Sequence, residues 1–124
     1  MSELTIDENL VLPEITELSV EETLVQLSLS IPKDLPYFEG HFPTEQVLPG
    51  VVQLGWAFKL GAKYFGLEPE YQTIEALKFQ QVVFPGTKVQ MTLQHNTAKN
   101  KLVFKIFDDN HSYSSGRIVL NSHV

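Results

Sequence analysis

The stretch Leu48–Phe65 reads LPGVVQLGWAFKLGAKYF and decides the fold. Its apolar side chains fall on nearly every side of a helix, and Lys59 and Lys63, four residues apart, mark a narrow polar stripe. A helix that is apolar nearly all round is a buried helix. Gly66 suits a C-terminal cap, and Pro69 blocks continuation. The stretch therefore predicts one long buried helix over these residues.

Period-two alternation on both sides of this helix predicts β-strands. Val20–Ile31 alternates, and a shorter strand is expected before it over Val11–Leu18. Four more strands are expected after the helix, over residues 73–83, 88–94, 102–107 and 113–120. We expect these four to form a meander, so the order is two strands, the helix and the meander. A sheet wrapped around one apolar helix is an α+β architecture.

The composition is that of a globular chain. Of its 124 residues, 43% are apolar and 19% are charged, and this length suggests a single domain over residues 1–124. The absence of cysteine excludes disulfides and thiolate chemistry. The acidic stretch Met1–Asn9 has no basic-plus-apolar signal, and no apolar run reaches the length of a membrane span. We expect a cytoplasmic protein.

Charge is unevenly spread along the chain, whose formal net charge is −6. Residues 1–32 carry seven acids and no Lys or Arg, whereas residues 71–124 carry six bases and three acids. The overall acidity argues against a nucleic-acid partner. The basic half could meet an acidic partner protein, or it could be a solvated sheet face with lysines on its edges, which is the commoner arrangement.

Residues Phe38–Leu48, FEGHFPTEQVL, contain a candidate base. His41 lies nine residues before Gly50, which opens the predicted helix. A helix start presents free backbone N–H groups and partial positive charge, and a histidine beside it can act as a base next to a polarised carbonyl. The ordinary imidazole pKa suits neutral pH. The plainer alternative is a histidine bonded into a proline-rich turn.

The helix start supplies the other candidates. Gly50 lets the backbone approach a ligand carbonyl, and the amide of Val51 lies beside it, although a plain turn glycine is the alternative. Residues 46–67 contain no Asp or Glu. Gln53 could bind a water or a carbonyl, or could satisfy its own amide in a buried site. Glu45 could reach inward, and solvent exposure is the alternative.

The remaining histidines suggest no metal site. His95, His111 and His123 lack the spacing of metal ligands, and no HExxH or paired-histidine motif is present. No GxSxG, GxGxxG or P-loop pattern appears either. We therefore expect a protein with neither a metal nor a cofactor.

Two motifs carry a resemblance to a known family. Gly40-His41-Phe42-Pro43, followed by VLPGV at residues 47–51, resembles the signature of the hot-dog-fold 3-hydroxyacyl-[acyl-carrier-protein] dehydratases of type II fatty-acid synthesis, FabZ and FabA. IEALKF at residues 74–79 and VFPG at residues 83–86 resemble that family's third strand and turn. The resemblance implies a hot-dog fold.

The resemblance covers about residues 10–120. The phrase VVQLGWA at residues 51–57 is closest to the ApeI-like dehydratases of aryl-polyene lipid biosynthesis. The family implies a homodimer, or a dimer of dimers, with an acyl tunnel at the dimer interface. It also implies that His41 is the catalytic histidine and that the backbone N–H groups at Gly50 and Val51 polarise the thioester carbonyl. Gly55 stands where the family has its acid, and Lys59 where a glutamine commonly follows.

The activity implied is removal of water from a 3-hydroxyacyl thioester on acyl carrier protein, giving the trans-2-enoyl product in aryl-polyene or fatty-acid-like biosynthesis. His41 would take the C2 proton, and the leaving hydroxyl would be protonated by His41 itself, by a bound water or by Glu45. One alternative is a non-catalytic hot-dog subunit that binds acyl chains or partners a second dehydratase subunit. An acyl thioesterase is a weaker alternative, since such enzymes usually need a helix carboxylate.

The lysines suggest a surface for the carrier protein. We expect the acidic carrier to dock near the tunnel mouth on some of Lys59, Lys63, Lys78 and Lys88, by charge complementarity.

Overall fold

The computed structural model describes residues 4–5, 10–36, 47–68 and 70–121. Within them lie one α-helix and a seven-stranded antiparallel sheet. The elements are β1 (Leu4–Thr5), β2 (Glu14–Val20), β3 (Leu24–Ser30), α1 (Gly50–Phe65), β4 (Glu70–Phe79), β5 (Lys88–Asn96), β6 (Lys101–Phe107) and β7 (Ser112–Leu120). The predicted α+β class is confirmed.

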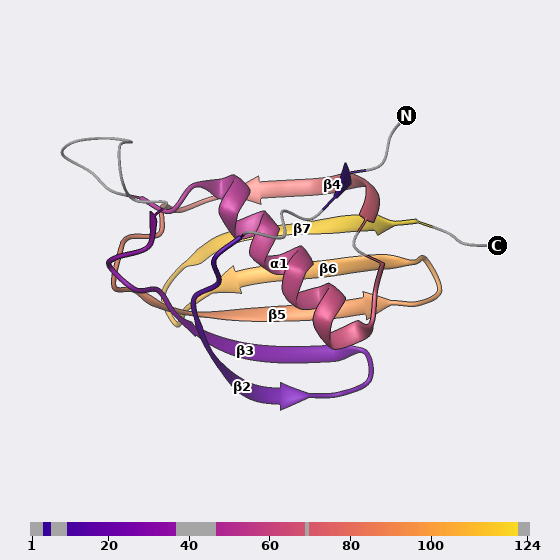
Figure 1. Cartoon of the computed structure of the whole chain (residues 1–124), viewed down its shortest axis with the longest axis horizontal. Helices are drawn as coiled ribbons and strands as arrows, with labels where there is room; N and C mark the ends of the chain where they lie inside the picture. The colour runs from indigo at the N-terminus through magenta and orange to yellow at the C-terminus, as the bar shows by residue number, and fades with distance from the viewer. Residues whose placement is uncertain (1–3, 6–9, 37–46, 69, 122–124) are drawn as a thin grey trace.

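The sheet has the strand order β1-β4-β7-β6-β5-β3-β2, and α1 lies across one of its faces (Figure 1). Alternate residues of the central strands point to opposite faces. On β6, Leu102, Phe104 and Ile106 are buried in the core on the helix side, and Lys101 and Lys105 lie on the outer face. The hydrophobic core therefore lies between α1 and the inner face of the sheet.

The helix is buried much as the sequence predicts. Trp56, Phe58 and Leu60 are almost completely buried, and the Phe58 ring packs edge-on against Tyr71 at 4.5 Å between centroids. The helix ends at Gly66, which has the left-handed φ of 65° that suits a glycine and donates its N–H to the Ala62 carbonyl. The predicted C-terminal cap is confirmed.

The helix begins at Gly50, the glycine expected to open it, and not at Leu48, where the predicted range starts. Pro49 is extended, with φ −59° and ψ 144°, and acts as the N-cap residue. Its carbonyl accepts hydrogen bonds from the N–H groups of Val52 at 3.1 Å and Gln53 at 3.3 Å. Gly50, the glycine of the Pro-Gly pair that the sequence singled out, is therefore the first helical residue.

The expected four-strand meander is wrong. β5, β6 and β7 do form a meander, but β4 pairs with β7, and the neighbour of β5 on its other side is β3. The reason is the path of the connection over residues 80–87. It starts beside Tyr113, at the end of β4, and it ends beside Ile31, whose carbonyl accepts a hydrogen bond from the N–H of Gly86. This connection crosses the fold, so Pro85-Gly86 does not close a hairpin.

β4 also contains a bulge. Its pairing register with β7 shifts between Glu75 and Lys78, and Ala76 has a positive φ of 50°. Bulges re-aim the side chains that follow them. Beyond the bulge, Phe79 faces α1, where its ring packs over Gly50.

Candidate functional site

The start of α1 leaves backbone donors free for a ligand. The N–H groups of Gly50 and Val51 precede the first intrahelical hydrogen bond, so the helix offers them no acceptor of its own. The first turn contains no acidic side chain, and the Pro49 side chain makes no cap hydrogen bond. Because the helix dipole adds partial positive charge here, the two amides are suited to hold a carbonyl oxygen that gains negative charge.

Gly50 is required by the packing around it. A Cβ built on Gly50 would lie 2.8 Å from atoms of the Phe79 ring. Since any larger residue would push this ring away, glycine keeps β4 close to the helix start. Val51, next along the helix, is 74% exposed, so the first turn of α1 reaches the surface.

Gln53 brings a polar group into the core one turn further on. The residue is 3% exposed, and its Nε2 donates to the Leu48 carbonyl at 3.3 Å. This bond sets which end of the side-chain amide carries the N–H group. Its Oε1 has no hydrogen-bond partner within the described part of the chain. The buried oxygen can therefore accept a hydrogen bond from a water or a ligand hydroxyl, so the predicted contact role of Gln53 stays open.

His41 and Glu45 lie outside the described residues, and their predicted roles stay predictions. The chain resumes at Val47, and the N–H of Leu48 donates to the Val83 carbonyl at 2.8 Å. Leu48, three residues after Glu45 in the sequence, is thus held beside the helix start.

Gly55 faces the N-terminal part of the chain. A Cβ on Gly55 would lie 2.8 Å from Cδ2 of Leu10. Residues 10–13 run across this side of α1, where Trp56 Nε1 donates to the Val11 carbonyl at 2.8 Å and Lys59 Nζ donates to the Leu10 carbonyl at 3.0 Å. We name residues 10–13 the N-terminal strap. The helix position where the family resemblance expects an acid is covered by this strap.

The four lysines predicted to dock a carrier protein lie on two faces. Lys59 and Lys63 are on α1. Lys78 is the register partner of Ser115, which in turn pairs with Lys105 on the outer face of the sheet. Lys88 precedes the buried Val89, so it also points outward. The structure therefore places two of these lysines on α1 and two on the outer face of the sheet, where β7 and β6 separate the strands that carry Lys78 and Lys88. Docking itself stays a prediction.

The outer face holds an ion-pair cluster that sequence reasoning missed. Lys101 Nζ lies 2.6 Å from Glu75 Oε1, and Arg117 Nε lies 3.6 Å from the same oxygen. The hydrogen bond from Lys101 is the main cause of the lowered pKa of Glu75. Beside the cluster, a hollow of about 210 Å³ is lined by Ala76, Lys78, Val103, Phe104, Ser115, Gly116 and Arg117. Strand pairing brought these residues together, and the sequence pattern gives no pairing partners.

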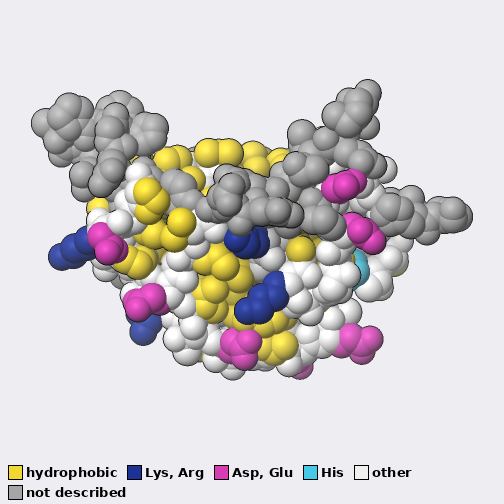
Figure 2. Space-filling model, in the orientation of Figure 1, with side chains coloured by type: hydrophobic (Ala, Val, Ile, Leu, Met, Phe, Trp, Pro, Cys, Tyr) yellow, Lys and Arg dark blue, Asp and Glu magenta, His cyan; other side chains and the backbone are white. Residues whose placement is uncertain are grey.

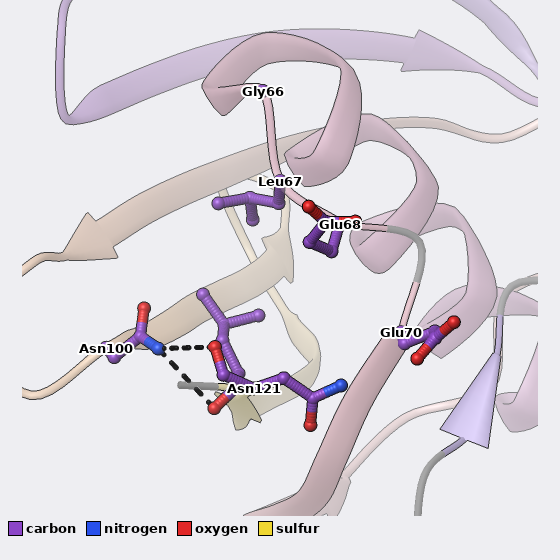
Figure 3. Close-up of a pocket in the computed structure, with 7 residues that line it drawn as sticks. Gly66, Leu67, Glu68, Glu70, Asn100 and Asn121 are labelled. Atoms are coloured by element: carbon purple, nitrogen blue, oxygen red, sulfur yellow. Dashed lines mark hydrogen bonds between the residues drawn. The ribbon is translucent and has the colours of Figure 1, made fainter. Parts of the chain in front are cut away.

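A second hollow, of about 170 Å³, lies at the opposite end of α1 from Gly50 (Figure 3). It is lined by Gly66, Leu67, Glu68, Glu70, Asn100, Leu120 and Asn121. Asn100 Nδ2 donates to the Asn121 carbonyl at 2.9 Å and closes the end of β7 onto the β5–β6 turn. The hollow is therefore separate from the candidate site.

Two tyrosines, the half-buried Tyr64 and the buried Tyr113, are held in the protonated form. Burial, followed by a hydrogen bond to Glu17, raises the pKa of Tyr64 to about 12. Burial, followed by a hydrogen bond to Asp108, raises the pKa of Tyr113 to about 12. Neither phenol is a base near neutral pH. Among the described residues, no group of three or more metal-ligating side chains occurs, and no helix has the length and apolarity needed to cross a bilayer.

Comparison with known proteins gives a consistent set of matches. The model of the ApeI-like family, described as ApeI dehydratase, matches residues 17–117. A 3-hydroxyacyl-[acyl-carrier-protein] dehydratase FabZ from Cupriavidus taiwanensis is 37% identical over 67 residues, which cover 47% of this chain and 45% of that protein. The chain thus spans about half the length of this relative.

Two solved structures share the fold. The dehydratase heterocomplex ApeI:P from Xenorhabdus doucetiae is 26% identical, with a TM-score of 0.82, over 90% of this chain and 100% of that one. An uncharacterized protein from Erwinia carotovora subsp. atroseptica is 31% identical, with a TM-score of 0.73, over 90% of this chain and 97% of that one. The predicted hot-dog fold is confirmed.

Proposed function

We propose that this chain, which belongs to the ApeI-like dehydratase family, removes water from a 3-hydroxyacyl thioester on acyl carrier protein to give the trans-2-enoyl product. The observation that carries the proposal is the start of α1. The N–H groups of Gly50 and Val51 have no acceptor within the helix, Gln53 one turn later has an unpartnered buried oxygen, and the GHFP motif precedes Gly50 by a few residues in the sequence. A carrier-bound substrate fits the cytoplasmic location expected from the sequence.

The chemistry follows from this arrangement. The thioester carbonyl binds at the N–H groups of Gly50 and Val51, which makes the C2 proton more acidic and stabilises the enolate oxygen. His41 takes that proton as general base. The C3–O bond then breaks, and the hydroxyl leaves as water once it has received a proton. The C2–C3 double bond forms from the electron pair left at C2.

The strap limits which group can protonate the leaving hydroxyl. Gly55 has no side chain, and Leu10 covers it, so α1 supplies no carboxylate at this position. We therefore propose that His41 returns the C2 proton to the leaving hydroxyl, directly or through a bound water. Glu45 is the other candidate donor. Aryl-polyene or fatty-acid-like biosynthesis is the proposed setting.

The experiment for this proposal is a turnover assay of the purified chain with a panel of 3-hydroxyacyl-carrier-protein substrates. Mass spectrometry of the carrier protein should show loss of one water from at least one substrate. If the chain dehydrates none of them alone but does so with an added dehydratase subunit, the catalytic proposal for the isolated chain is wrong.

The free edge of β4 supports a dimer. β1 pairs only with Glu70 and Tyr71, which leaves the remainder of that edge unpaired within the described residues. Exposed apolar side chains occur at the end of β4, in the connection that follows it and at the start of α1, and Figure 2 shows hydrophobic atoms at the surface over the end of β4 and the start of α1. They are Val51, Leu77, Phe79, Val82 and Phe84, named here the β4 patch. Such an edge is a pairing surface, and we propose a homodimer through it, or a dimer of dimers, with the acyl tunnel at the interface.

A second candidate function has its own support. Because Leu10 covers Gly55, this chain could act as an acyl-binding or partner subunit beside a second dehydratase subunit that carries an acid. The Xenorhabdus relative is described as a heterocomplex. Activity of the isolated chain favours the first proposal, and activity that appears only on mixing favours this one. No observation favours the thioesterase alternative.

The carrier protein is the remaining proposed partner. Lys59 and Lys63 lie on the same side of the molecule as the start of α1, whereas Lys78 and Lys88 lie on the outer face of the sheet. We propose that the first pair guides the acidic carrier to the site, and that the second pair contributes less.

A further inference from the structure

Two buried oxygen atoms in the core have no hydrogen-bond partner among the described residues. One is Oε1 of Gln53, which is 3% exposed, and the other is Oγ of Ser114, which is fully buried. Buried polar groups are normally hydrogen-bonded, and leaving one unpaired costs stability. A third buried atom of this kind, His95 Nε2, belongs to a ring that packs against Phe65 at the other end of α1. Gln53 and Ser114 therefore need an explanation of their own.

Strand pairing places Ser114 next to the helix start. Ser114 is the register partner of Phe79 on β4 and of the buried Ile106 on β6, so its side chain lies on the inner face of the sheet. The Phe79 ring packs over Gly50, the first residue of α1. Ser114 thus faces the part of the core that the first turn of α1 covers.

Backbone hydrogen bonds tie Gln53 to the same corner. Its Nε2 donates to the carbonyl of Leu48, whose own N–H donates to the Val83 carbonyl. Upstream on the same connection, the N–H of Gln80 donates to the carbonyl of Tyr113, the residue before Ser114. Residues 80–83 therefore contact a neighbour of each unpartnered oxygen, Tyr113 beside Ser114 and Leu48 beside Gln53.

We propose that Gln53 and Ser114 form a binding subsite for the 3-hydroxyl group of the substrate, and for the water that this group becomes. The inference rests on the proposed dehydratase function. Because the Gln53 amide already uses an N–H on Leu48, its free oxygen offers an acceptor only. The Ser114 hydroxyl can donate. An alcohol or a water, which donates one hydrogen bond and accepts another, matches this pair.

Other groups of the substrate match the pair less well. A thioester carbonyl only accepts hydrogen bonds, so it would leave the Gln53 oxygen unpaired. A carboxylate would place negative charge against that same oxygen. The amides of Gly50 and Val51 supply donors for the carbonyl instead. The helix start therefore binds the thioester carbonyl oxygen, and the subsite binds the 3-hydroxyl oxygen. Holding both oxygens orients C2 and C3 for elimination.

The test compares two probes that differ by one hydroxyl group. These are a 3-hydroxyacyl pantetheine thioester and the saturated acyl thioester of equal length, titrated by calorimetry into a His41→Ala background that prevents turnover. Gln53→Met and Ser114→Ala should each lower the affinity for the hydroxylated probe roughly tenfold, and change the affinity for the saturated probe less than about twofold. Ser115→Ala, next on β7 and on the opposite face, is the matched control and should bind both probes like the background.

A thermal melt shows whether each variant is folded. Ser114→Ala should melt no lower than the His41→Ala chain, because it removes an unpaired buried oxygen, whereas Gln53→Met also loses the hydrogen bond to the Leu48 carbonyl. If Gln53→Met melts lower, Ser114→Ala carries the test alone. Equal discrimination between the probes in Ser114→Ala and its background would overturn the subsite, even in a chain whose native form dehydrates its substrate. Failure of the native chain to dehydrate any substrate would overturn the proposed function separately.

Discussion

Leu10 packs against Gly55 so closely that a Cβ on the glycine would lie 2.8 Å from Leu10 Cδ2. The strap is held in place by the hydrogen bonds from Trp56 and Lys59 to the carbonyls of Val11 and Leu10. This contact places an aliphatic side chain at the helix position where the family resemblance expects a carboxylate. A dehydratase built in this way needs its proton donor elsewhere.

The contact predicts a coupling between the two residues. Alanine gains about 1 kcal/mol over glycine inside a helix. In the native chain this gain is offset by displacement of the Leu10 side chain, so Gly55→Ala should be close to neutral. In a Leu10→Ala background the same change should stabilise by about 1 kcal/mol. Urea denaturation of the four proteins measures the cycle, and a full gain in the native chain would show that Leu10 does not occupy this space.

The pair Tyr113 and Asp108 predicts an acid dependence of stability. The hydrogen bond from Tyr113 is the largest cause that lowers the pKa of Asp108 below its usual value. A folded-state pKa below the unfolded one means that the bond stabilises the protein above the unfolded pKa, near 4, and ceases to do so as pH falls through the folded pKa. Tyr113→Phe should therefore be less stable than the native chain at pH 7, with a smaller difference at pH 3.

Denaturant midpoints for both proteins at the two pH values check this prediction. A difference that stays constant from pH 7 to pH 3 would assign the loss to packing rather than to the carboxylate. The same measurement on Tyr64→Phe provides a comparison, because Tyr64 donates its hydrogen bond to a different carboxylate, that of Glu17.

The β4 patch predicts the effect of a charge at the dimer interface. Val82 is 50% exposed, and Val82→Glu would bury an unpaired carboxylate if this surface is covered by a second copy. Light scattering should show a shift from dimer to monomer. Leu18→Glu on β2, a side chain 53% exposed at the opposite edge of the sheet, is the matched control and should stay dimeric. A dimer retained by Val82→Glu would place the interface elsewhere.

Carrier-protein binding should depend on salt. Exposed charge pairs are screened over about 10 Å at 0.1 M ionic strength. The affinity for acyl carrier protein should therefore be lower at about 0.5 M salt than at about 0.05 M salt. Over this range the screening length shortens roughly threefold, because it varies inversely with the square root of ionic strength. Lys63→Gln should weaken binding more than Lys88→Gln does. An affinity that is independent of salt would rule out docking by these lysines.

The helix and most strands could be predicted because each has its own periodic pattern. The apolar run that contains Trp56 and the stop at Gly66 were sufficient for α1. Pairing partners could not be predicted in this way: alternation marks β4 as a strand but does not say that it lies beside β7. The strap was missed for a related reason, since Leu10 belongs to no periodic segment and its contact with Gly55 joins distant parts of the chain.

The candidate site was predicted only in part. Gly50 and Val51 were identified because a Pro-Gly pair before an apolar run indicates a helix start. Ser114 was not, because the pattern of the strand expected over residues 113–120 does not mark a serine as a buried polar group, whereas Ser114 is fully buried within β7. His41 was identified from its motif, and it lies outside the described residues.

The most direct test of the account is the rate of dehydration by the purified native chain and by His41→Ala, measured on the same 3-hydroxyacyl-carrier-protein substrate. A positioned acid–base group contributes roughly 10²–10⁴ in rate, so His41→Ala should lose at least a hundredfold while its thermal melt stays unchanged. His111→Ala, a histidine in the turn before β7, should keep its rate, and Glu45→Gln should lose much less than His41→Ala. A folded His41→Ala protein that dehydrates the substrate at the native rate would contradict the account.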